Sequence, residues 1–434
     1  MLKVGAACLD ITPPLGTPLR GFFNERRAAA VHDPLYVRSF AFEQEGGEGI
    51  AVAVCDLIGV GRTYLDRAKA RLAESTGLAP HGVLIACTHT HTGPETGEDS
   101  YTEFLVGRIA DAVRLAWERR APAEVGWGRA SEHRVAFNRR YRMRDGTVQT
   151  NPGVGNPEVL EPAGPTDPEV GVLGVRRPGA GESGGAIGLL ANFALHYVGT
   201  PDAQRAVSAD YFGYFAQQIQ RLRGESFVAA LSNGASGDIN NIDVLGGSRP
   251  ANEHYQHTAR VGAVVAAAAL WAWNEMVFSP DVPLGAAMAE VALTRRPLPS
   301  DADVARARET EARVAAGERV LMGERAFARR VLQRISGTPD EISTWVQALR
   351  LGELALVGVP GELFVELGLA IKQGSPFEQT IVLELANDSI GYIPTRRAFE
   401  EGAYEPEASL LSPGQGERVV ESAIALLHQL KGAA

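Results

Sequence analysis

The sequence predicts an α/β (α+β) fold in which layered, mixed β-sheets are flanked by helices. A first observation is that β-hairpin patterns such as 37–60 occur beside amphipathic helical patterns such as 101–120. A second is that several apolar runs of strand length end in polar, reactive side chains, where α/β proteins place their sites. Since no clean linker divides the chain, we expect a single domain over residues 1–434.

The elements of the first half follow from local pattern. Residues 37–60 indicate two strands joined by a Gly-rich turn, and residues 63–77 indicate a helix. The short apolar run 82–87 is typical of a strand, and 101–120 has the spacing of an amphipathic helix. Residues 141–168 are rich in Pro and Gly and predict a long loop, and loops of that length in a compact domain are often functional.

The second half alternates in the same way. Residues 185–200 are strand-like and contain His196 near their end, and 209–223 predict a helix. The charged segment 302–335 has helical spacing and predicts a solvated helix broken near Gly323. Further expected elements are a strand entering a polar loop at 226–240, a buried Ala-rich helix at 261–273, strand–turn–helix at 351–364, strand then loop at 380–395, and a helix at 418–430.

Composition restricts the possible classes of protein. The chain has 434 residues, 45% apolar and 22% charged, which is usual for a soluble globular protein. A formal net charge of -10 argues against nucleic-acid binding, which needs a concentrated basic surface. Three cysteines give no disulfide framework, and no targeting segment is visible, so we expect a cytoplasmic protein. The longest apolar run is too short for stable membrane insertion, and the oligomeric state cannot be read from the sequence.

Two of the nine histidines, His89 and His91, follow the strand-like run 82–87. Residues i and i+2 of a strand face the same way, so both rings can enter one pocket. With a third histidine and a carboxylate they would suit zinc, but alone the pair is more typical of polar residues in a loop. His254 and His257 form a second candidate pair, for which a solvated helix start is the alternative.

Polar side chains also follow the other predicted strands. They are His196; Asn233, Asp238 and Asn240; Glu362; and Asn387, Asp388 and Tyr392. Asp56, Asp210 and Asp238 are candidates for a general base, although Asp is also common as a cap or turn residue. The chain contains no Gly-x-Ser-x-Gly elbow, no phosphate-binding loop and no Gly-x-Gly-x-x-Gly after a strand.

A set of ordered motifs covers nearly the whole chain. They are GAACLDITPP, HDPLYVRSFAF, THTHTGPE, FNRR, NFALHYVGT, SADYFG, VPGELF, and NDSIGYIPT followed by YEPEAS. In this order they resemble the N-terminal catalytic domain of the neutral/alkaline (non-lysosomal) ceramidase family. Tyr392 and Tyr404 also keep the spacing of the two tyrosines of that family.

The resemblance implies one zinc ion per chain, held by His89, His196, Glu362 and Tyr392. It also implies that three residues contact the substrate: His91, Arg139 and Tyr404. A zinc-activated water would attack an amide carbonyl, and His91 and Tyr404 would donate to the developing oxyanion. Arg139 would hold a polar or anionic part of the substrate, and Asp238 is added as a catalytic candidate for proton transfer.

Three departures from the family pattern shape the functional hypothesis. Asn240 stands where the family has a serine, the chain ends at Ala434 as expected for a short form without the family's C-terminal immunoglobulin-like domain, and no signal peptide is seen. We therefore predict a zinc-dependent hydrolase that cleaves the amide bond of a soluble, small N-acyl substrate. The alternatives are a zinc esterase or lactonase on the same scaffold, and a non-catalytic binding protein with a degenerate site.

Overall fold

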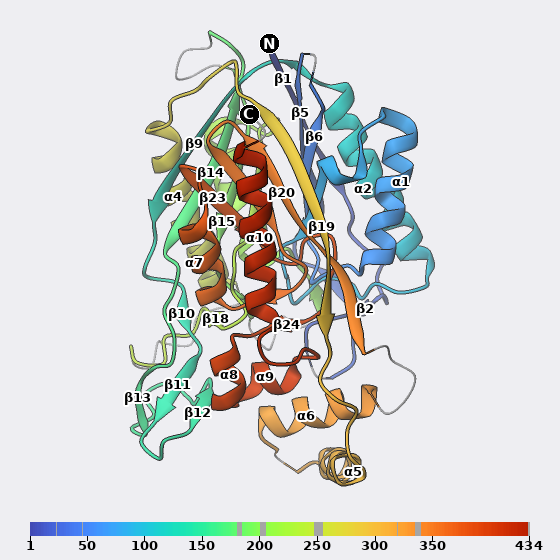
Figure 1. The fold of residues 1–434 in the computed structure, drawn as a ribbon, viewed down its shortest axis with the longest axis vertical. Coiled ribbons are helices and arrows are strands. Elements are labelled where there is room, and N and C mark those ends of the chain that lie inside the picture. Colours follow the sequence, from blue (N-terminus) through green and yellow to red (C-terminus); the bar gives the residue numbers. More distant parts are fainter. Residues whose placement is uncertain are drawn as a thin grey trace.

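The computed structural model describes residues 1–434 except 23, 46, 180–184, 200–204, 247–254, 319, 335–339 and 433–434, and the side chain of residue 322. Within the described residues, three mixed sheets of four or five strands form the body of the molecule, with helices on the outside (Figure 1). The predicted α/β class with layered mixed sheets is confirmed.

The first sheet has the order β7-β6-β5-β1-β8. Its strands are β1 (Leu2–Asp10), β5 (Tyr36–Gln44), β6 (Ile50–Cys55), β7 (Val83–Cys87) and β8 (Ala121–Pro122). β5 and β6 form the predicted antiparallel hairpin, whereas β6 and β7 are parallel and are connected through α1 (Arg62–Thr76). The helix α2 (Ser100–Glu118) begins after Asp99, whose side chain accepts a hydrogen bond from the Thr102 backbone N–H and so caps the helix.

The second sheet has the order β17-β15-β14-β9. Its strands are β9 (Glu124–Ser131), β14 (Glu169–Arg176), β15 (Ala186–Phe193) and β17 (Val228–Asn233). β15 and β17 are parallel and are connected through α3 (Asp210–Arg223), which packs beside the Ala-rich helix α4 (Gln256–Asn274). Small alanine side chains let α4 approach both α3 and the sheet closely.

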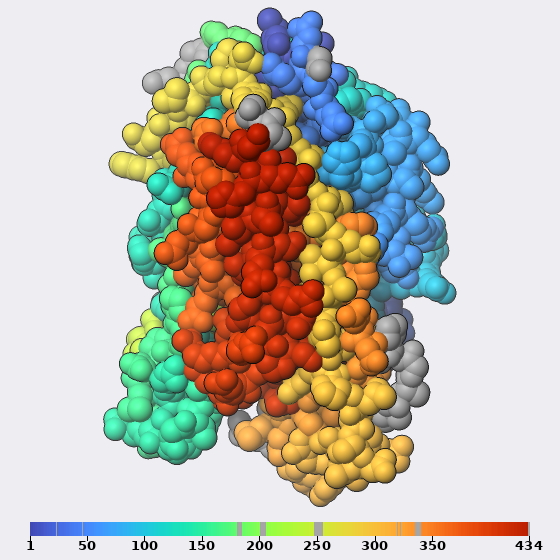
Figure 2. Space-filling model, in the orientation of Figure 1, coloured from blue at the N-terminus to red at the C-terminus, as the bar shows by residue number. Residues whose placement is uncertain are grey.

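The third sheet has the order β19-β20-β21-β23. Its strands are β19 (Leu284–Thr294), β20 (Glu341–Leu351), β21 (Leu354–Gly358) and β23 (Gln379–Leu383). β21 and β23 are parallel and are connected through α7 (Val365–Gly374). The C-terminal helix α10 (Gln415–Gly432) covers the centre of this face, as Figure 2 shows in red.

Alternation along the strands divides each sheet between two cores. Leu189 packs toward α3 and α4, and its neighbour Leu190 enters a core that the three sheets share. Phe40 of the first sheet and Leu356 of the third enter the same shared core. The outer faces are covered by α1 and α2, by α3 and α4, and by α7 and α10. Burial on both faces explains why β6, β7 and β21 are apolar at every position.

This arrangement fixes where the reactive residues lie. Each sheet contains one parallel β–α–β unit: β6–α1–β7, β15–α3–β17 and β21–α7–β23. His89 follows β7, His196 follows β15 and Glu362 follows β21. The carboxyl ends of parallel strands are where open α/β sheets bind ligands. Here three such ends, one from each sheet, meet at one place.

The structure differs from the sequence prediction at residues 141–168. This segment is not one loop, because it contributes most of a small sheet of β11 (Arg140–Met143), β12 (Val148–Thr150) and β13 (Val159–Pro162). Strands β11 and β12 form a hairpin around the Asp145-Gly146 turn, closed by the Met143 N–H donating to the Thr147 carbonyl. The strands of this small sheet are too short for an alternation of apolar and polar residues to be recognised among the Pro and Gly residues.

The charged segment 302–335 forms two helices, α5 (Asp301–Ala315) and α6 (Met322–Gln333). The described residues 316–318, 320 and 321 are not helical, and Gly323 lies in the first turn of α6. Both helices interrupt one hairpin, since Thr294 of β19 pairs with Glu341 of β20. They project at the lower end of the molecule, beyond α8 (Arg396–Glu401) and α9 (Tyr404–Ala408) (Figure 1).

Short elements complete the chain. They are β2 (Pro18–Leu19), β3 (Arg26–Arg27), β4 (Ala30–Val31), η1 (Pro80–Gly82), β10 (Phe137–Asn138), β16 (Ala206–Val207), β18 (Ile239–Asn240), β22 (Glu362–Leu363) and β24 (Tyr392–Ile393). Among the helices that the structure describes, none is long and apolar enough to span a bilayer.

Candidate active site

His89 is held in one orientation by the backbone around it. Its φ is 68°, a left-handed conformation that costs a non-glycine residue about 1–3 kcal/mol. The cost is offset locally: the His89 N–H donates to the Leu57 carbonyl at 2.8 Å, and Nδ1 lies 2.8 Å from the Ile58 carbonyl. Because Nδ1 donates to that carbonyl, Nε2 carries no proton in the neutral ring and is available as a ligand atom.

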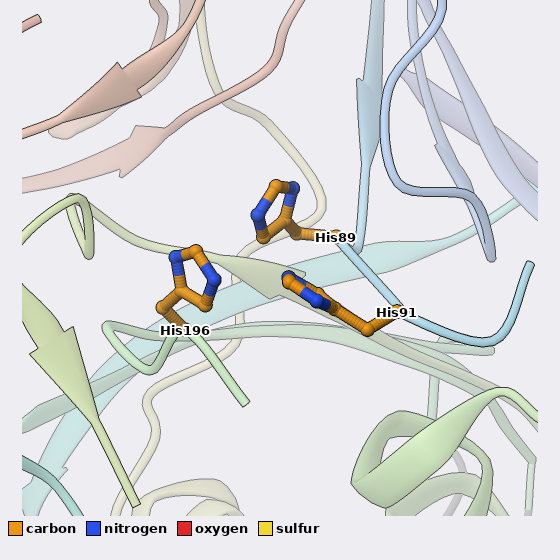
Figure 3. A group of neighbouring side chains, drawn as sticks. All are labelled: His89, His91 and His196. Carbon is orange, nitrogen blue, oxygen red and sulfur yellow. The ribbon is translucent and has the colours of Figure 1, made fainter. Parts of the chain in front are cut away.

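His91 and His196 complete a cluster of three imidazoles (Figure 3). The ring centroids of His89 and His196 are 4.4 Å apart, and that of His91 lies 4.9 and 4.8 Å from them. One ligand nitrogen from each ring lies within 4.8 Å of the others, and all three residues are buried. The expectation that His89 and His91 enter one pocket with His196 therefore agrees with the geometry.

Glu362 brings a carboxylate to the same place. Its Oε2 lies 3.4 Å from Nε2 of His89 and 3.5 Å from Nδ1 of His196. In the described part of the chain, none of these three buried atoms has a hydrogen-bond partner of normal geometry. Buried polar atoms are nearly always hydrogen-bonded, so a group of three that converge without partners suits a metal ion.

The electrostatics of the cluster agree with this description. Burial would raise the pKa of Glu362, but His89 and Arg139 outweigh it, so the pKa is lowered and the side chain is a carboxylate. Burial would lower the pKa of His89, but Glu362 outweighs it and the pKa is raised. A metal ion that binds here would displace the proton from Nε2 of His89. Burial lowers the pKa of both His91 and His196 well below the usual range, and neighbouring cations act in the same direction. Both rings are therefore neutral at pH 7, the state in which imidazole binds a metal.

His91 is positioned through its backbone. Asp210 Oδ2 accepts hydrogen bonds from Thr90 Oγ1 at 2.7 Å and from the His91 N–H at 3.1 Å. Burial raises the pKa of Asp210 to about 7. On the other side Gly21 has a φ of 111°, and a Cβ there would come within 2.9 Å of the His91 Cα. Glycine is thus required where this loop crosses His91.

Tyr392 and Arg139 are linked directly. Tyr392 lies in β24, opposite Glu362 of β22, so that both side chains belong to one small parallel sheet. Arg139 Nη2 donates to the Tyr392 hydroxyl at 3.0 Å and to the Gly237 carbonyl at 2.7 Å, and Nε donates to Glu405 at 2.7 Å. Arg139 is 4% exposed, so its contacts fit a residue that positions Tyr392 better than one that reaches a substrate.

The cluster opens into a cavity of about 200 Å³. The residues that line this cavity are Arg20, Gly21, Phe22, Ile58, His89, His91, Arg329, Glu362, Tyr392 and Tyr404. Tyr404 is the first residue of α9, and its ring meets that of Tyr392 edge-on at 5.6 Å. Of the eight site residues expected from the sequence, five are in the wall: His89, His91, Glu362, Tyr392 and Tyr404.

Asp238 has structural partners. Its carboxylate accepts hydrogen bonds from the Val365 N–H at 2.8 Å and from Asn138 Nδ2 at 2.9 Å, which join α7 to the segment before Arg139. Burial raises the pKa of Asp238 to about 6. Asn240, at the family's serine position, donates to Asn151 Oδ1 at 2.6 Å. These contacts give both residues a role in holding the loops beneath the site.

The other candidates lie elsewhere. Asp56 forms a buried ion pair with Arg38 at 2.7 Å, which explains its burial in structural terms. His254 lies outside the described residues, and the ring of His257 stacks on Tyr197 at 6.3 Å. The pair at 254 and 257 therefore adds no described ligand to the cluster.

Sequence reasoning missed three residues at the site. Glu384, directly after β23, accepts a hydrogen bond from Ser236 Oγ at 2.6 Å, and burial raises its pKa to about 8. Arg20 and Arg329 line the cavity. Glu384 lies in the apolar run before the Asn387 loop, and the two arginines lie in segments that contain no motif. No sequence signal therefore marks these three residues, and only the three-dimensional structure places them at the site.

Comparison with known proteins gives two sequence relatives. No family model matches the chain. A neutral ceramidase from Mycobacterium tuberculosis is 24% identical over 94% of this chain and 74% of its own length. A neutral ceramidase from Pseudomonas aeruginosa is 22% identical over 94% of this chain and 69% of its own length.

Solved structures show that the fold is shared. The crystal structure of the neutral ceramidase from Pseudomonas aeruginosa matches with a TM-score of 0.77 at 19% identity, covering 100% of this chain and 75% of that one. A ceramidase complexed with C2 matches with a TM-score of 0.75 at 17% identity, with the same coverage of both chains. The ordered motifs, the relatives that match almost the whole chain and the common fold show that this chain is similar to neutral ceramidases in both sequence and fold.

Proposed function

We propose that the chain uses zinc to hydrolyse the amide bond of a small, soluble N-acyl compound. Its sequence relatives are neutral ceramidases, and in line with them the chain is a hydrolase acting on amide C–N bonds. The zinc, the roles of the residues and the kind of substrate are the proposal. One observation carries it: Nε2 of His89, Nδ1 of His196 and Oε2 of Glu362 are buried, close together and without hydrogen-bond partners among the described residues.

In this proposal His89, His196, Glu362 and Tyr392 hold the metal. Two neutral imidazoles and a carboxylate are an ordinary donor set for zinc, and the Tyr392 oxygen would be the fourth ligand. When bound, zinc supplies Lewis acidity: it polarises a carbonyl and lowers the pKa of water to about 7. Arg139 supports the Tyr392 oxygen by donating a hydrogen bond to it.

Residues that line the cavity would stabilise the developing charge on the carbonyl oxygen and contact the acyl chain. His91 is neutral and keeps one N–H, with which it would donate to the oxygen of the carbonyl as charge develops there. Burial raises the pKa of Tyr404 to about 12, so its hydroxyl keeps its proton and can donate to the same oxygen. Phe22 and Ile58 form an apolar part of the wall, which suits a short acyl chain.

The cavity volume supports a small substrate. About 200 Å³ is below the roughly 300–1,000 Å³ of sites that enclose a drug-sized ligand. A two-chain lipid would have to leave most of its surface outside the cavity. Esters and lactones present the same carbonyl chemistry, so a zinc esterase or lactonase is the second candidate.

Metal analysis and a substrate panel test the proposal together. We expect purified protein to contain about one zinc per chain, and we expect chelation to remove activity that added zinc restores. The panel compares short N-acyl amines with the matching esters and lactones. Protein that has no bound metal and is equally stable with and without chelator would contradict the proposal. Cleavage of esters and lactones alone would select the second candidate.

A further inference from the structure

We infer that two arginines on the cavity wall, Arg20 and Arg329, recognise a carboxylate on the substrate. The inference rests on the proposed function and names its substrate class: amides that carry a carboxylate near the scissile bond. Neutral N-acyl amino alcohols of the same size would be poorer substrates.

The two helices inserted between β19 and β20 are α5 and α6, and α6 brings Arg329 to the site. Helix α6 packs against α9, whose first residue is Tyr404. Arg330 anchors the two helices, because its Nε donates to the Glu407 carbonyl at 2.8 Å and its guanidinium pairs with the Glu407 carboxylate at 3.1 Å. Arg329, the preceding residue, lies in the cavity wall with Tyr404.

Arg329 is a partly desolvated cation. Its side chain is half-buried, and burial together with repulsion from Arg325 lowers its pKa, while Glu311 and Tyr404 act in the opposite direction. A carboxylate entering the cavity would meet a partly desolvated guanidinium. Charge-assisted hydrogen bonds of this kind are roughly twice as strong as neutral ones, and the planar fork favours bidentate binding.

Arg20 comes from the loop that crosses His91. Its side chain makes no hydrogen bond or ion pair with any residue that the structure describes. Its backbone is nevertheless fixed, because Arg26 Nη2 donates to the Arg20 carbonyl at 2.6 Å and to the His91 carbonyl at 3.0 Å. The Arg26 guanidinium also lies 4.2 Å from the centre of the Phe22 ring. Arg26 therefore links the backbone of Arg20 to that of His91.

The charge of the cavity wall contrasts with that of the chain. The whole protein has a formal net charge of -10, which would repel an anion at long range. The acidic residue in the wall is Glu362, which belongs to the His89 and His196 cluster. The two arginines therefore give the wall of the cavity a local positive charge that the composition would not predict.

A matched pair of amides tests this inference. N-hexanoylglycine and N-hexanoylethanolamine differ only by a carboxylate in place of a hydroxymethyl group. A second pair, N-butylsuccinamic acid and N-butyl-4-hydroxybutanamide, places the same difference on the acyl side. We expect kcat/KM to favour the acid of at least one pair by tenfold or more, and the pair that does so tells which side of the amide bears the charge.

The variants are Arg20→Gln, Arg329→Gln and both together, with Arg27→Gln as the control. Arg27 is exposed and pairs with Glu25. In the double variant the ratio of kcat/KM for the acid to kcat/KM for the neutral amide should fall close to one. Urea unfolding of each variant shows whether the protein is folded. The control should keep the full preference.

Three results would overturn the inference: equal cleavage of acid and alcohol by the natural protein in both pairs, a preference for the alcohols, or an unchanged preference in the double variant. Failure of the proposed function is distinguishable, because then none of the four amides is cleaved. In that event calorimetry measures the binding of N-hexanoylglycine to the natural protein and to the double variant. Binding that is lost in the double variant supports the arginine site, whereas equal binding to both proteins, or no binding to either, contradicts it.

Discussion

Glu362 and Tyr392 are paired partners in a two-residue parallel sheet, and Arg139 donates to the Tyr392 hydroxyl. One backbone register thus places a carboxylate and a phenol on the same side of the site. Arg139 connects this pair to Glu405, the residue after Tyr404. The geometry of the proposed fourth ligand therefore depends on a buried arginine and on two strands that follow β21 and β23.

Replacing Arg139 should destabilise the protein strongly. Arg139→Gln leaves Glu405 buried with one cation fewer, and breaking a buried ion pair costs about 3–5 kcal/mol. Arg142→Gln is the matched control, because Arg142 is 40% exposed in its pair with Glu401 and should change stability by less than about 1 kcal/mol. Urea unfolding in the presence of a chelator measures both without a contribution from metal binding. Equal losses of unfolding free energy in the two variants would show that the contacts of Arg139 stabilise the protein no more than an exposed ion pair does.

Adding one methyl group at Gly21 should impair catalysis through His91. In Gly21→Ala the new Cβ meets the His91 Cα at 2.9 Å, so the loop or the ring must move. Gly16→Ala is the control, since Gly16 also has a positive φ, 89°, but has open space around it. Both variants bear backbone strain of about 1–2 kcal/mol. We expect kcat/KM to fall at least tenfold in Gly21→Ala only, with zinc content unchanged. A similar kcat/KM in both variants would contradict a catalytic role for His91.

Lys69 should make stability depend on pH. It lies in α1 with its Nζ buried and without a hydrogen-bond partner in the described chain, and burial lowers its pKa to about 7. Between pH 7 and the usual lysine pKa of about 10.4, the unfolded chain binds a proton that the folded chain does not. Stability should therefore rise with pH in this range, by up to about 1.4 kcal/mol per unit.

The Lys69→Met variant isolates this effect. It lacks the titrating amine, so the free energy of unfolding of the natural protein minus that of Lys69→Met should increase from pH 7 to pH 9.5. Lys3→Met changes an exposed lysine and should show no such slope. Urea unfolding at several pH values gives the three curves. A difference that stays flat with pH would mean that Lys69 keeps its charge in the folded protein.

Much of the site could be predicted because its residues follow strands. The buried runs before His89 and His196 are short and apolar, and their polar ends mark the carboxyl edges of parallel strands. The motif order then suggested Glu362 and Tyr392, whose pairing in β22 and β24 no local pattern contains. A two-residue strand has too little alternation to be read from sequence.

Other features depend on contacts between distant segments. Residues 302–335 read as a solvated helix because charge dominates their pattern, yet α6 brings Arg329 to the cavity through its packing on α9. The sequence suggested that Arg139 contacts the substrate, whereas its guanidinium is engaged by Glu405, Gly237 and Tyr392. Neither contact leaves a trace in sequence spacing, because each joins elements far apart along the chain.

The zinc content of two histidine variants tests the account most directly. His196→Ala removes a proposed ligand and should lose both zinc and activity, because too few ligands remain. His91→Ala removes a proposed donor to the carbonyl oxygen and should keep about one zinc per chain while turnover falls roughly 100-fold or more. Metal analysis after dialysis, with activity measured on the same samples, gives both results. Equal loss of zinc in the two variants would contradict the account, since it would make His91 a ligand in the three-histidine cluster.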